Sequence, residues 1–283
     1  MGVNMMKLVI DSHIHFDLYD HKQQQQIIRE LKTYDIEKLI AVSMNEVSAQ
    51  KTLLLSKEYS DIEPAIGYHP EQSLPKEEEL LRLIALIDEN YLSITAIGEV
   101  GLPYYLRQEH PDIPLEPYIE ILQLFIEKAE QYQLPIALHA IYDDASIVCT
   151  LLEKYSIKKA HFHWYKGKTT ITERLIQNGY MISFTPDTIY RDSRLSLMSQ
   201  VPLTQIMVET DGPWPFDGPF KNEMTHPKML HHVIRKIAEV KRRPLDEVYD
   251  ILYDNTKRFY LEKESCCGKK SVLVENGINI IDT

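Results

Sequence analysis

Short apolar runs rich in β-branched residues alternate with longer stretches of helical periodicity along most of the chain. The alternation repeats eight times and predicts strands near residues 8–13, 38–44, 63–68, 94–99, 135–140, 158–163, 180–185 and 205–210. Helices are predicted near residues 22–34, 46–60, 76–90, 115–132, 143–155, 169–178, 188–200 and 226–241. Strict alternation is typical of a parallel sheet, and eight such units close into a barrel. We therefore predict an α/β fold, a TIM (β/α)8 barrel, with a doubly wound open sheet as the alternative.

The C-terminal part of the chain adds two features to this pattern. A further helix is predicted near residues 245–262, and it would complete a single barrel domain over residues 1–262. In the tail, residues 263–283, the dipeptide Asn276-Gly277 stands between two apolar segments. This dipeptide is a strong signal for a tight turn between strands, so the tail is predicted to form a β-hairpin.

Composition narrows the classes of protein that fit. A length of 283 residues fits one large α/β barrel or two ordinary domains, and 44% hydrophobic and 26% charged residues are typical of a soluble globular enzyme. No stretch is apolar and long enough to span a bilayer, and the N-terminus lacks the apolar core of a signal peptide, so we expect a cytoplasmic protein with no membrane partner. The three cysteines, Cys149, Cys266 and Cys267, are too few for a disulfide framework or a thiolate zinc site.

The chain is acidic, with a net charge of −11. This charge argues against a protein that coats nucleic acid, because such proteins usually present a basic face. It does not exclude a nuclease, since divalent cations in a pocket reverse the sign of the local charge where a phosphate binds.

His13 and His15 stand at the end of the first predicted strand. Residues two apart in a strand project to the same face, so the two imidazoles can bind one metal ion, although an ordinary surface pair is an equally good interpretation of the motif alone. Further candidate ligands stand at the ends of later predicted strands: Glu99, His139, His163 and Asp211. Active sites of this fold lie at the C-terminal ends of the strands, so all six side chains are predicted to meet at one rim.

Four imidazoles and two carboxylates are more than one tetrahedral zinc ion needs, and a pair of divalent cations is the simplest assignment. The first ion is predicted to bind His13, His15 and Asp211. The second is predicted to bind His139 and His163, with Glu99 between the two ions. Imidazole favours zinc or manganese and phosphodiester chemistry often uses magnesium or manganese, so zinc, manganese and magnesium are all candidates.

Five segments follow one another in a recognisable order: Asp11-Ser12-His13-Ile14-His15-Phe16-Asp17, Gly67-Tyr68-His69-Pro70, Ile97-Gly98-Glu99-Val100-Gly101-Leu102, Leu134-Pro135-Ile136-Ala137-Leu138-His139 and Glu209-Thr210-Asp211-Gly212-Pro213. Together they resemble the TatD-type metal-dependent hydrolases of the amidohydrolase superfamily, from about residue 8 to residue 262. The resemblance implies hydrolysis of phosphodiester bonds, as by a deoxyribonuclease. It also implies that Glu99 bridges the metal ions.

Three places depart from the family's pattern. The segment His163-Trp164-Tyr165-Lys166-Gly167 stands where His-Cys-Phe-Ser-Gly is usual, and Ala140 stands where Ser is usual. The segment Lys221-Asn222-Glu223-Met224 only partly matches the family's Arg-Asn-Glu-Pro. The metal ligands are therefore retained, whereas the residues around the substrate have changed. A different hydrolase on the same site, an amidohydrolase, a lactonase or a small-molecule phosphoesterase, is the alternative to a nuclease.

The expected catalytic carboxylates are Glu99 and Asp211. A water activated between the ions would lose its proton to Asp211 and then attack phosphorus. Candidate phosphate contacts are His69, Arg107 and Lys166, which lie in loops predicted to follow strands on the same face. The predicted substrate is DNA or another phosphate ester, and the sequence does not define the oligomeric state.

Asp11, His161 and Glu209 each precede a candidate ligand by two residues. They should point the same way one layer deeper in the barrel, and we predict that they support the ligands or pack in the core. The long loops at residues 101–114 and 211–225 are predicted to wall the substrate pocket. The remaining histidines are expected to be solvated: His21, His110, His226, His231 and His232.

Overall fold

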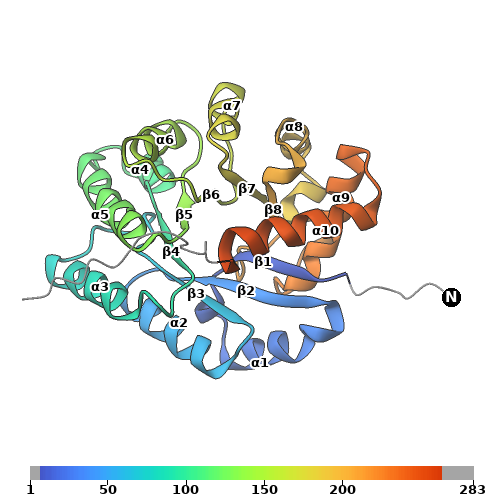
Figure 1. Ribbon diagram of the computed structural model, residues 1–283, viewed down its shortest axis with the longest axis horizontal. Coiled ribbons are helices and arrows are strands. Elements are labelled where there is room, and N and C mark those ends of the chain that lie inside the picture. Colours follow the sequence, from blue (N-terminus) through green and yellow to red (C-terminus); the bar gives the residue numbers. More distant parts are fainter. Residues whose placement is uncertain (1–6, 263–283) are drawn as a thin grey trace, which may run out of the picture.

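The computed structural model describes residues 7–262. Eight parallel strands pair in the order of the sequence, and helices surround them (Figure 1). Each strand lies at a predicted position: β1 Val9–Ile14, β2 Ile36–Val42, β3 Ile62–Ile66, β4 Ala96–Gly101, β5 Ile136–His139, β6 Ala160–Phe162, β7 Met181–Phe184 and β8 Ile206–Val208. Nearly all their residues are buried, as expected for strands covered on both faces. The prediction of a TIM barrel is confirmed.

The helices follow the predicted alternation: α1 His21–Glu30, α2 Glu46–Glu58, α3 Glu77–Asn90, α5 Glu116–Tyr132, α6 Asp144–Lys154, α7 Thr169–Gln177, α8 Asp192–Gln200 and α9 Leu230–Lys241. One difference lies in the predicted loop 101–114, which contains a short helix, α4 Tyr104–Glu109. The helix forms because the carboxylate of Glu71, from the loop after β3, accepts two backbone N–H groups of its first turn.

Hydrogen bonds between the ends of β1 and the chain after β8 complete the barrel. The amide of Asp211 donates to the carbonyl of His13 at 2.9 Å, and the amide of His15 donates to the carbonyl of Gly212 at 2.7 Å. The first and last strands therefore hold the His13-x-His15 motif beside the turn that follows β8.

The predicted C-terminal helix is also present, as α10 Leu245–Thr256 followed by a π-helical turn at Lys257–Leu261. Helix α10 packs against β1 and β8 (Figure 1). Phe259 and Tyr260 from the turn pack against apolar side chains of the strands: Ile10, Ile40, Val42, Ala65, Ala96, Met181 and Met207. This apolar cluster fills the barrel beneath the polar side chains at its rim.

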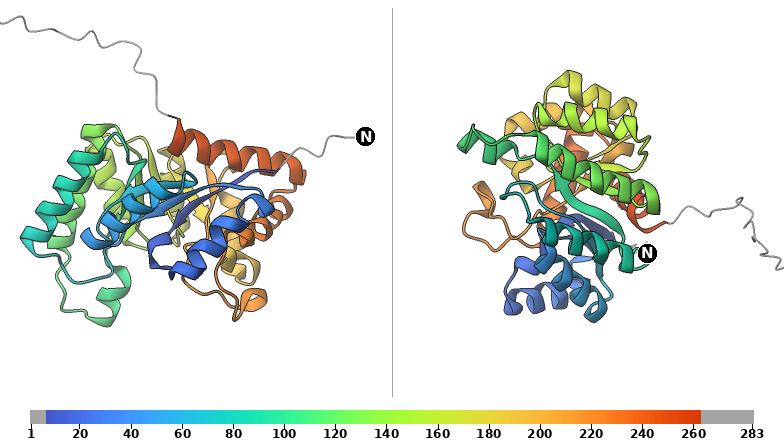
Figure 2. Two further views of the ribbon diagram at one scale, coloured as in Figure 1. Left: turned by 90° about the horizontal axis from the view of Figure 1, so that it is seen from below. Right: turned by 90° about the vertical axis from the view of Figure 1, so that its left-hand side faces the viewer.

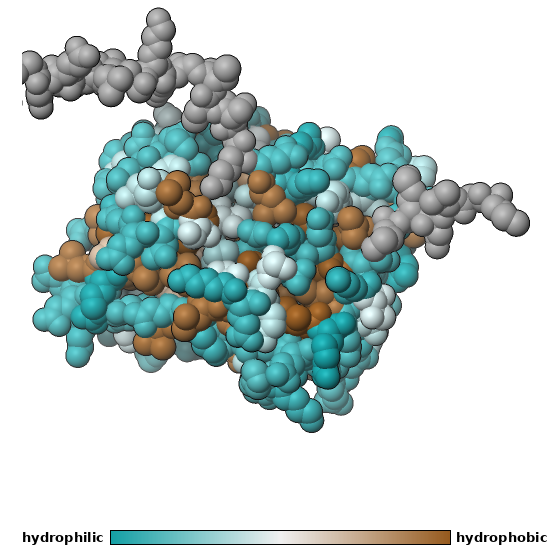
Figure 3. Space-filling model, turned by 60° about the horizontal axis from the view of Figure 1, so that its bottom comes forward, coloured by the Kyte–Doolittle hydropathy of each residue, from teal (hydrophilic) through white to brown (hydrophobic). Residues whose placement is uncertain are grey.

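Figure 2 shows that α4 and the segment after β8 project from the same end of the molecule, as predicted for the walls of the pocket. On the face drawn in Figure 3, hydrophobic side chains appear in separate patches among hydrophilic ones.

Within residues 7–262, no helix is both long and apolar enough to cross a membrane. The hairpin predicted for residues 263–283 lies outside the described part of the chain.

Candidate metal centre

Glu99, near the end of β4, lies at the centre of a cluster of imidazoles and is fully buried. Its Oε2 is 3.1 Å from Nε2 of His13 and 3.1 Å from Nε2 of His15. Its Oε1 is 2.6 Å from Nε2 of His163 and 3.0 Å from Nδ1 of His139. The two oxygens of one carboxylate therefore face two separate pairs of ring nitrogens, one from β1 and one from the ends of β5 and β6.

Asp211 joins the pair from β1. Its Oδ1 lies 3.4 Å from Nε2 of His15 and 3.5 Å from Nε2 of His13. Asp211 has a positive φ of 50°, which is uncommon for a residue other than glycine. This backbone conformation turns the chain sharply after β8. The hydrogen bond from the backbone N–H of Asp211 to the carbonyl of His13 fixes that turn, so the carboxylate is held against the imidazoles.

The second pair is extended by His69, from the loop after β3. Nδ1 of His139 is 3.2 Å from Nε2 of His163, and Nε2 of His69 is 3.3 Å from Oε1 of Glu99. His69, Glu99 and His139 form one of the groups whose donor atoms lie close enough to hold a cation. The predicted substrate contact His69 is thus placed inside the cluster rather than at its edge.

The donor atoms fit a divalent cation. Nε2 of His15 and Oδ1 of Asp211 are buried and have no hydrogen-bond partner among the described residues. Unpaired buried polar atoms are costly, and a cation between them would satisfy both. Neutral imidazole nitrogens and carboxylate oxygens are the ligands that zinc and manganese accept.

The charges in the cluster also favour binding of a cation. Burial alone would raise the pKa of Glu99, but the charges of His163, His69 and His13 hold it well below its ordinary value. Burial opposes ionisation of Asp211 as well, and there too the neighbouring imidazoles, His15 first, lower the pKa of the carboxyl. Both carboxylates are therefore ionised and available as ligands.

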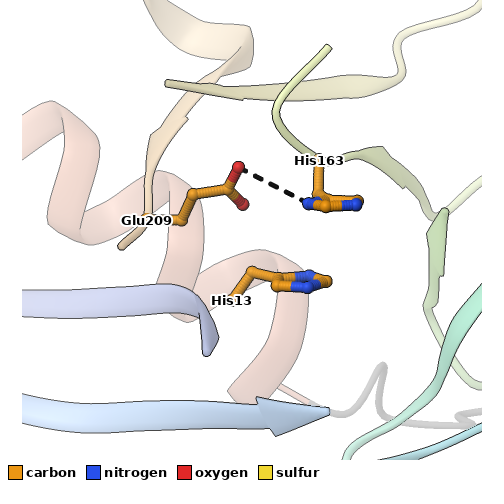
Figure 4. Close-up of side chains that lie close together, drawn as sticks. All are labelled: His13, His163 and Glu209. Carbon is orange, nitrogen blue, oxygen red and sulfur yellow. Dashed lines mark ion pairs between the residues drawn. The ribbon is translucent and has the colours of Figure 1, made fainter. Parts of the chain in front are cut away.

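Glu209 supports this cluster from behind (Figure 4). Its Oε1 accepts the backbone N–H of Trp164 at 2.6 Å and lies 3.7 Å from Nδ1 of His163. The His13 and His163 rings stack, with centroids 3.9 Å apart and planes 6° apart. A buried carboxylate behind a ring leaves the opposite nitrogen of His163 free to face Glu99.

His161 and Asp11 occupy supporting positions. The ring of His161 lies between two hydroxyls, 2.7 Å from Tyr260 Oη and 2.7 Å from Ser183 Oγ, so both nitrogens are engaged away from the cluster. Asp11 accepts the amide and the hydroxyl of Thr210 at 2.9 and 2.5 Å, and burial raises the pKa of its carboxyl to about 8. The two side chains tie β6 and β1 to their neighbours.

A pocket of about 360 Å³ opens onto the cluster. Its lining comprises His69, Glu71, Tyr105, His139, Ile141, His163, Trp164, Lys166, Asp211 and Trp214. Lys166 Nζ donates to Tyr105 Oη at 2.8 Å, and burial lowers the pKa of this lysine to about 8. Arg107 does not line the pocket: it lies on α4 with Nη1 3.8 Å from Asp144 Oδ1.

Glu71 was not identified from the sequence, although it lines the pocket and contacts a candidate ligand. It lies in the loop after β3, two residues after His69, and no local pattern marks it.

Two histidines that were expected at the surface are buried or partly buried in the structure. His226 is 1% exposed, and His231 is partly buried, with its ring 2.7 Å from Tyr249 Oη.

Comparisons with known proteins show which family this chain resembles. The family model described as TatD related DNase matches residues 10–261. An uncharacterized metal-dependent hydrolase of Haemophilus influenzae is 38% identical over 254 residues, which cover 89% of this chain and 99% of the relative. The human deoxyribonuclease TATDN3 is 27% identical over 263 residues, covering 89% of this chain and 94% of that protein.

A solved structure shows the same fold. The crystal structure of YJJV, a TatD homologue from Escherichia coli, superposes with a TM-score of 0.80 at 22% identity, and the match covers 90% of this chain and 98% of the other. The family model spans nearly all the described residues, and the relatives are matched over almost their full length. The chain therefore belongs to the TatD family of metal-dependent hydrolases.

Proposed function

We propose that the protein is a phosphodiesterase, with DNA or a related phosphate ester as substrate, and that it uses two divalent cations. The observation that supports this proposal is the position of Glu99, whose two oxygens face two separate sets of donors. A carboxylate shared in this way is the arrangement expected of a two-metal hydrolase. Deoxyribonuclease activity in the name of the human relative favours a phosphodiester as substrate.

Each cation would have its own ligands. His13, His15 and Asp211 would hold the first ion, His139 and His163 the second, and Glu99 both. Such cations supply Lewis acidity, which favours deprotonation of water and stabilises the charge that builds on phosphoryl oxygens. His69 lies beside the second set and is available to that ion or to the substrate.

Asp211 is the base in this proposal. Its carboxyl is ionised, because the neighbouring imidazoles lower its pKa, and its Oδ1 faces the cluster without a hydrogen-bond partner among the described residues. An ionised carboxylate in this position can accept the proton of the attacking water. Lys166 lines the same pocket and is placed to contact a phosphate group of the substrate.

The pocket size supports a second candidate function. A volume of about 360 Å³ lies in the range of small-molecule sites. A small-molecule phosphoesterase would use the same ligands and the same base, and it would not need an extended groove. Lactones and amides would also fit a pocket of this size, and they are the substrates that distinguish a different hydrolase from a phosphodiesterase.

The test is a substrate and metal panel. The protein is stripped with chelator, reloaded with magnesium, manganese, cobalt or zinc, and assayed on single-stranded DNA, duplex DNA, bis-p-nitrophenyl phosphate and a lactone. We expect cleavage of phosphodiesters that chelator abolishes and that His13→Ala reduces by orders of magnitude. The control is His21→Ala, since His21 is exposed on α1. Lactone hydrolysis without phosphodiester cleavage would contradict the proposal.

A further inference from the structure

One wall of the pocket contains a lysine, Lys166, that forms no ion pair within the described residues. Lys166 is buried, with 9% of its surface exposed, and its Nζ lies 4.3 Å from the centroid of the Trp164 ring. Its hydrogen-bond partner is the neutral hydroxyl of Tyr105. Among residues 7–262, no acidic side chain lies within ion-pair distance of this amine, and Asp187 and Asp211 act on it only at longer range. A buried ammonium that forms no ion pair is well placed to receive an anion.

Two arginines lie next to this wall, connected to it through Trp164 and Asp187, although neither arginine lines the pocket itself. Arg194 Nε and Arg191 Nε lie 3.0 and 3.7 Å from the same oxygen, Oδ2 of Asp187. The indole N–H of Trp164 donates to that oxygen at 3.2 Å. Trp164 therefore connects the two groups, because its ring lies under Lys166 and its nitrogen contacts the carboxylate that holds both arginines.

The residues of this wall are held in place by burial and by hydrogen bonds. Asp187 is 1% exposed and also accepts the hydroxyl of Thr185 at 2.7 Å, which fixes the turn after β7. Trp164 has a positive φ of 36° and is held by the hydrogen bond from its backbone N–H to the carboxylate of Glu209. Arg194 is mostly buried, whereas Arg191 is half exposed.

The charges on this wall do not balance. Arg191 and Arg194 share one carboxylate, Asp187, and Lys166 forms no ion pair within residues 7–262. Two of the three cations therefore lack a paired carboxylate, in a chain whose net charge is −11. After burial, the charge of Arg194 is the largest influence that lowers the pKa of Lys166, so the two groups lie near enough to repel each other. A dianion between them would remove this repulsion.

We infer that Lys166, Arg191 and Arg194 form a subsite for a second phosphate group of the substrate, apart from the one that is hydrolysed. A phosphate monoester matches the two positive charges that lack a paired carboxylate, and arginine binds its oxygens with two parallel hydrogen bonds. The protein would thus select phosphodiesters that carry an additional terminal phosphate. The inference rests on the proposed function, because it names the substrate class of the same site.

The experiment uses a matched pair of substrates that differ by one phosphate. The p-nitrophenyl ester of thymidine monophosphate is compared with the same ester carrying a phosphate on the other hydroxyl of the sugar. Wild-type enzyme should favour the second ester by about tenfold or more in kcat/KM, the size expected for charged hydrogen bonds. Lys166→Met and Arg191→Gln should each reduce this preference toward unity. Arg29→Gln, at an exposed arginine on α1, is the control and should keep it.

A binding measurement separates this inference from the proposed function. Calorimetry on the metal-loaded protein compares thymidine bisphosphate with thymidine monophosphate, and it requires no turnover. Tighter binding of the bisphosphate, abolished by Lys166→Met, would support the subsite. If neither ester were hydrolysed in that case, the proposed function would fail and the subsite would stand. Equal affinity for the two nucleotides, or a preference that survives in both variants, would overturn the subsite.

Discussion

Oε1 of Glu71 lies 3.0 Å from Nε2 of His139, on the side of the ring away from Glu99. The same carboxylate accepts the backbone N–H groups of Tyr105 and Leu106 at 2.8 and 2.7 Å. One side chain therefore orients a candidate metal ligand and also holds the first turn of α4. Burial opposes its ionisation, but the hydrogen bond from His139 lowers its pKa, so the carboxylate is charged.

The first prediction concerns Glu71→Gln. A carboxylate behind a ligating imidazole fixes its orientation and raises its basicity, and loss of such a partner typically weakens metal binding about 10- to 100-fold. We expect affinity for the second cation to fall by this factor, measured by calorimetry on the metal-free protein, with the first cation affected less. The control is Glu78→Gln, at an exposed carboxylate of α3. Unchanged affinity for both cations would show that Glu71 serves only as a cap for α4.

The second prediction tests Asp211 as the base. Asp211→Asn keeps the size of the side chain and removes the charge, so turnover of phosphodiesters should fall about 10²- to 10⁴-fold, the range expected for loss of general base catalysis. Metal content, measured by elemental analysis, distinguishes this effect from loss of a ligand. A variant that retains its metals and has near wild-type activity would exclude Asp211 from the proton transfer.

The barrel could be predicted because its strands are marked locally. Each is a short run of apolar, largely β-branched residues, and its burial on both faces follows from the fold. The positions of His13 and His15 follow from the same pattern, because residues two apart in a strand share a face. Strand ends in a barrel converge, so Glu99 and Asp211 could be placed in the same cluster before any coordinates were known.

Contacts between distant loops could not be predicted in the same way. Helix α4 begins without a capping residue of its own, and the carboxylate that replaces the cap comes from the loop after β3. Arg107 follows a predicted strand, yet the rotation of α4 turns it toward Asp144 rather than into the pocket. His226 precedes a proline in a polar segment, yet its ring is buried and packs edge-on against Tyr34.

The third prediction concerns a close approach of two strands at the site. A Cβ added to Gly101 would lie 1.9 Å from the carbonyl oxygen of His139, its partner in the β4–β5 register. Gly101→Ala should therefore displace β5, lowering both the melting temperature and metal affinity. Gly179→Ala is the comparison: nothing lies within 4 Å of its Cβ, and its φ of +76° makes about 1 kcal/mol of strain the expected cost. Equal losses in the two variants would contradict the steric argument.

The fourth prediction separates a core histidine from a ligand. His161 is fully buried and engaged by Tyr260 and Ser183. His161→Leu would leave both hydroxyls without their partner, so we expect the free energy of unfolding to fall by about 2–4 kcal/mol. Metal affinity should change much less than in His163→Leu. A variant of His161 that lost metal binding while keeping its stability would identify this ring as a ligand.

The fifth prediction is an acid-sensitive contribution of His226. Nδ1 of its ring accepts the amide N–H of Lys228 at 3.0 Å, and Nε2 has no hydrogen-bond partner among the described residues, although Glu30 Oε2 lies 3.4 Å away. Burial lowers the pKa of the ring from 6.5 to about 4. The folded protein therefore keeps the ring neutral at pH values where the unfolded chain binds a proton.

The sign of the effect follows from this difference. The contribution of His226 is fully present above about pH 6.5 and is lost as the pH falls toward 4, by about 3 kcal/mol at most. His226→Asn retains an acceptor for the Lys228 amide but cannot titrate, so its stability should depend less on pH over this range. Urea unfolding of the two proteins at a series of pH values measures the difference, with His21→Asn as the exposed control. Parallel curves for wild type and His226→Asn would contradict the prediction, because they would mean that folding does not lower the pKa of the ring.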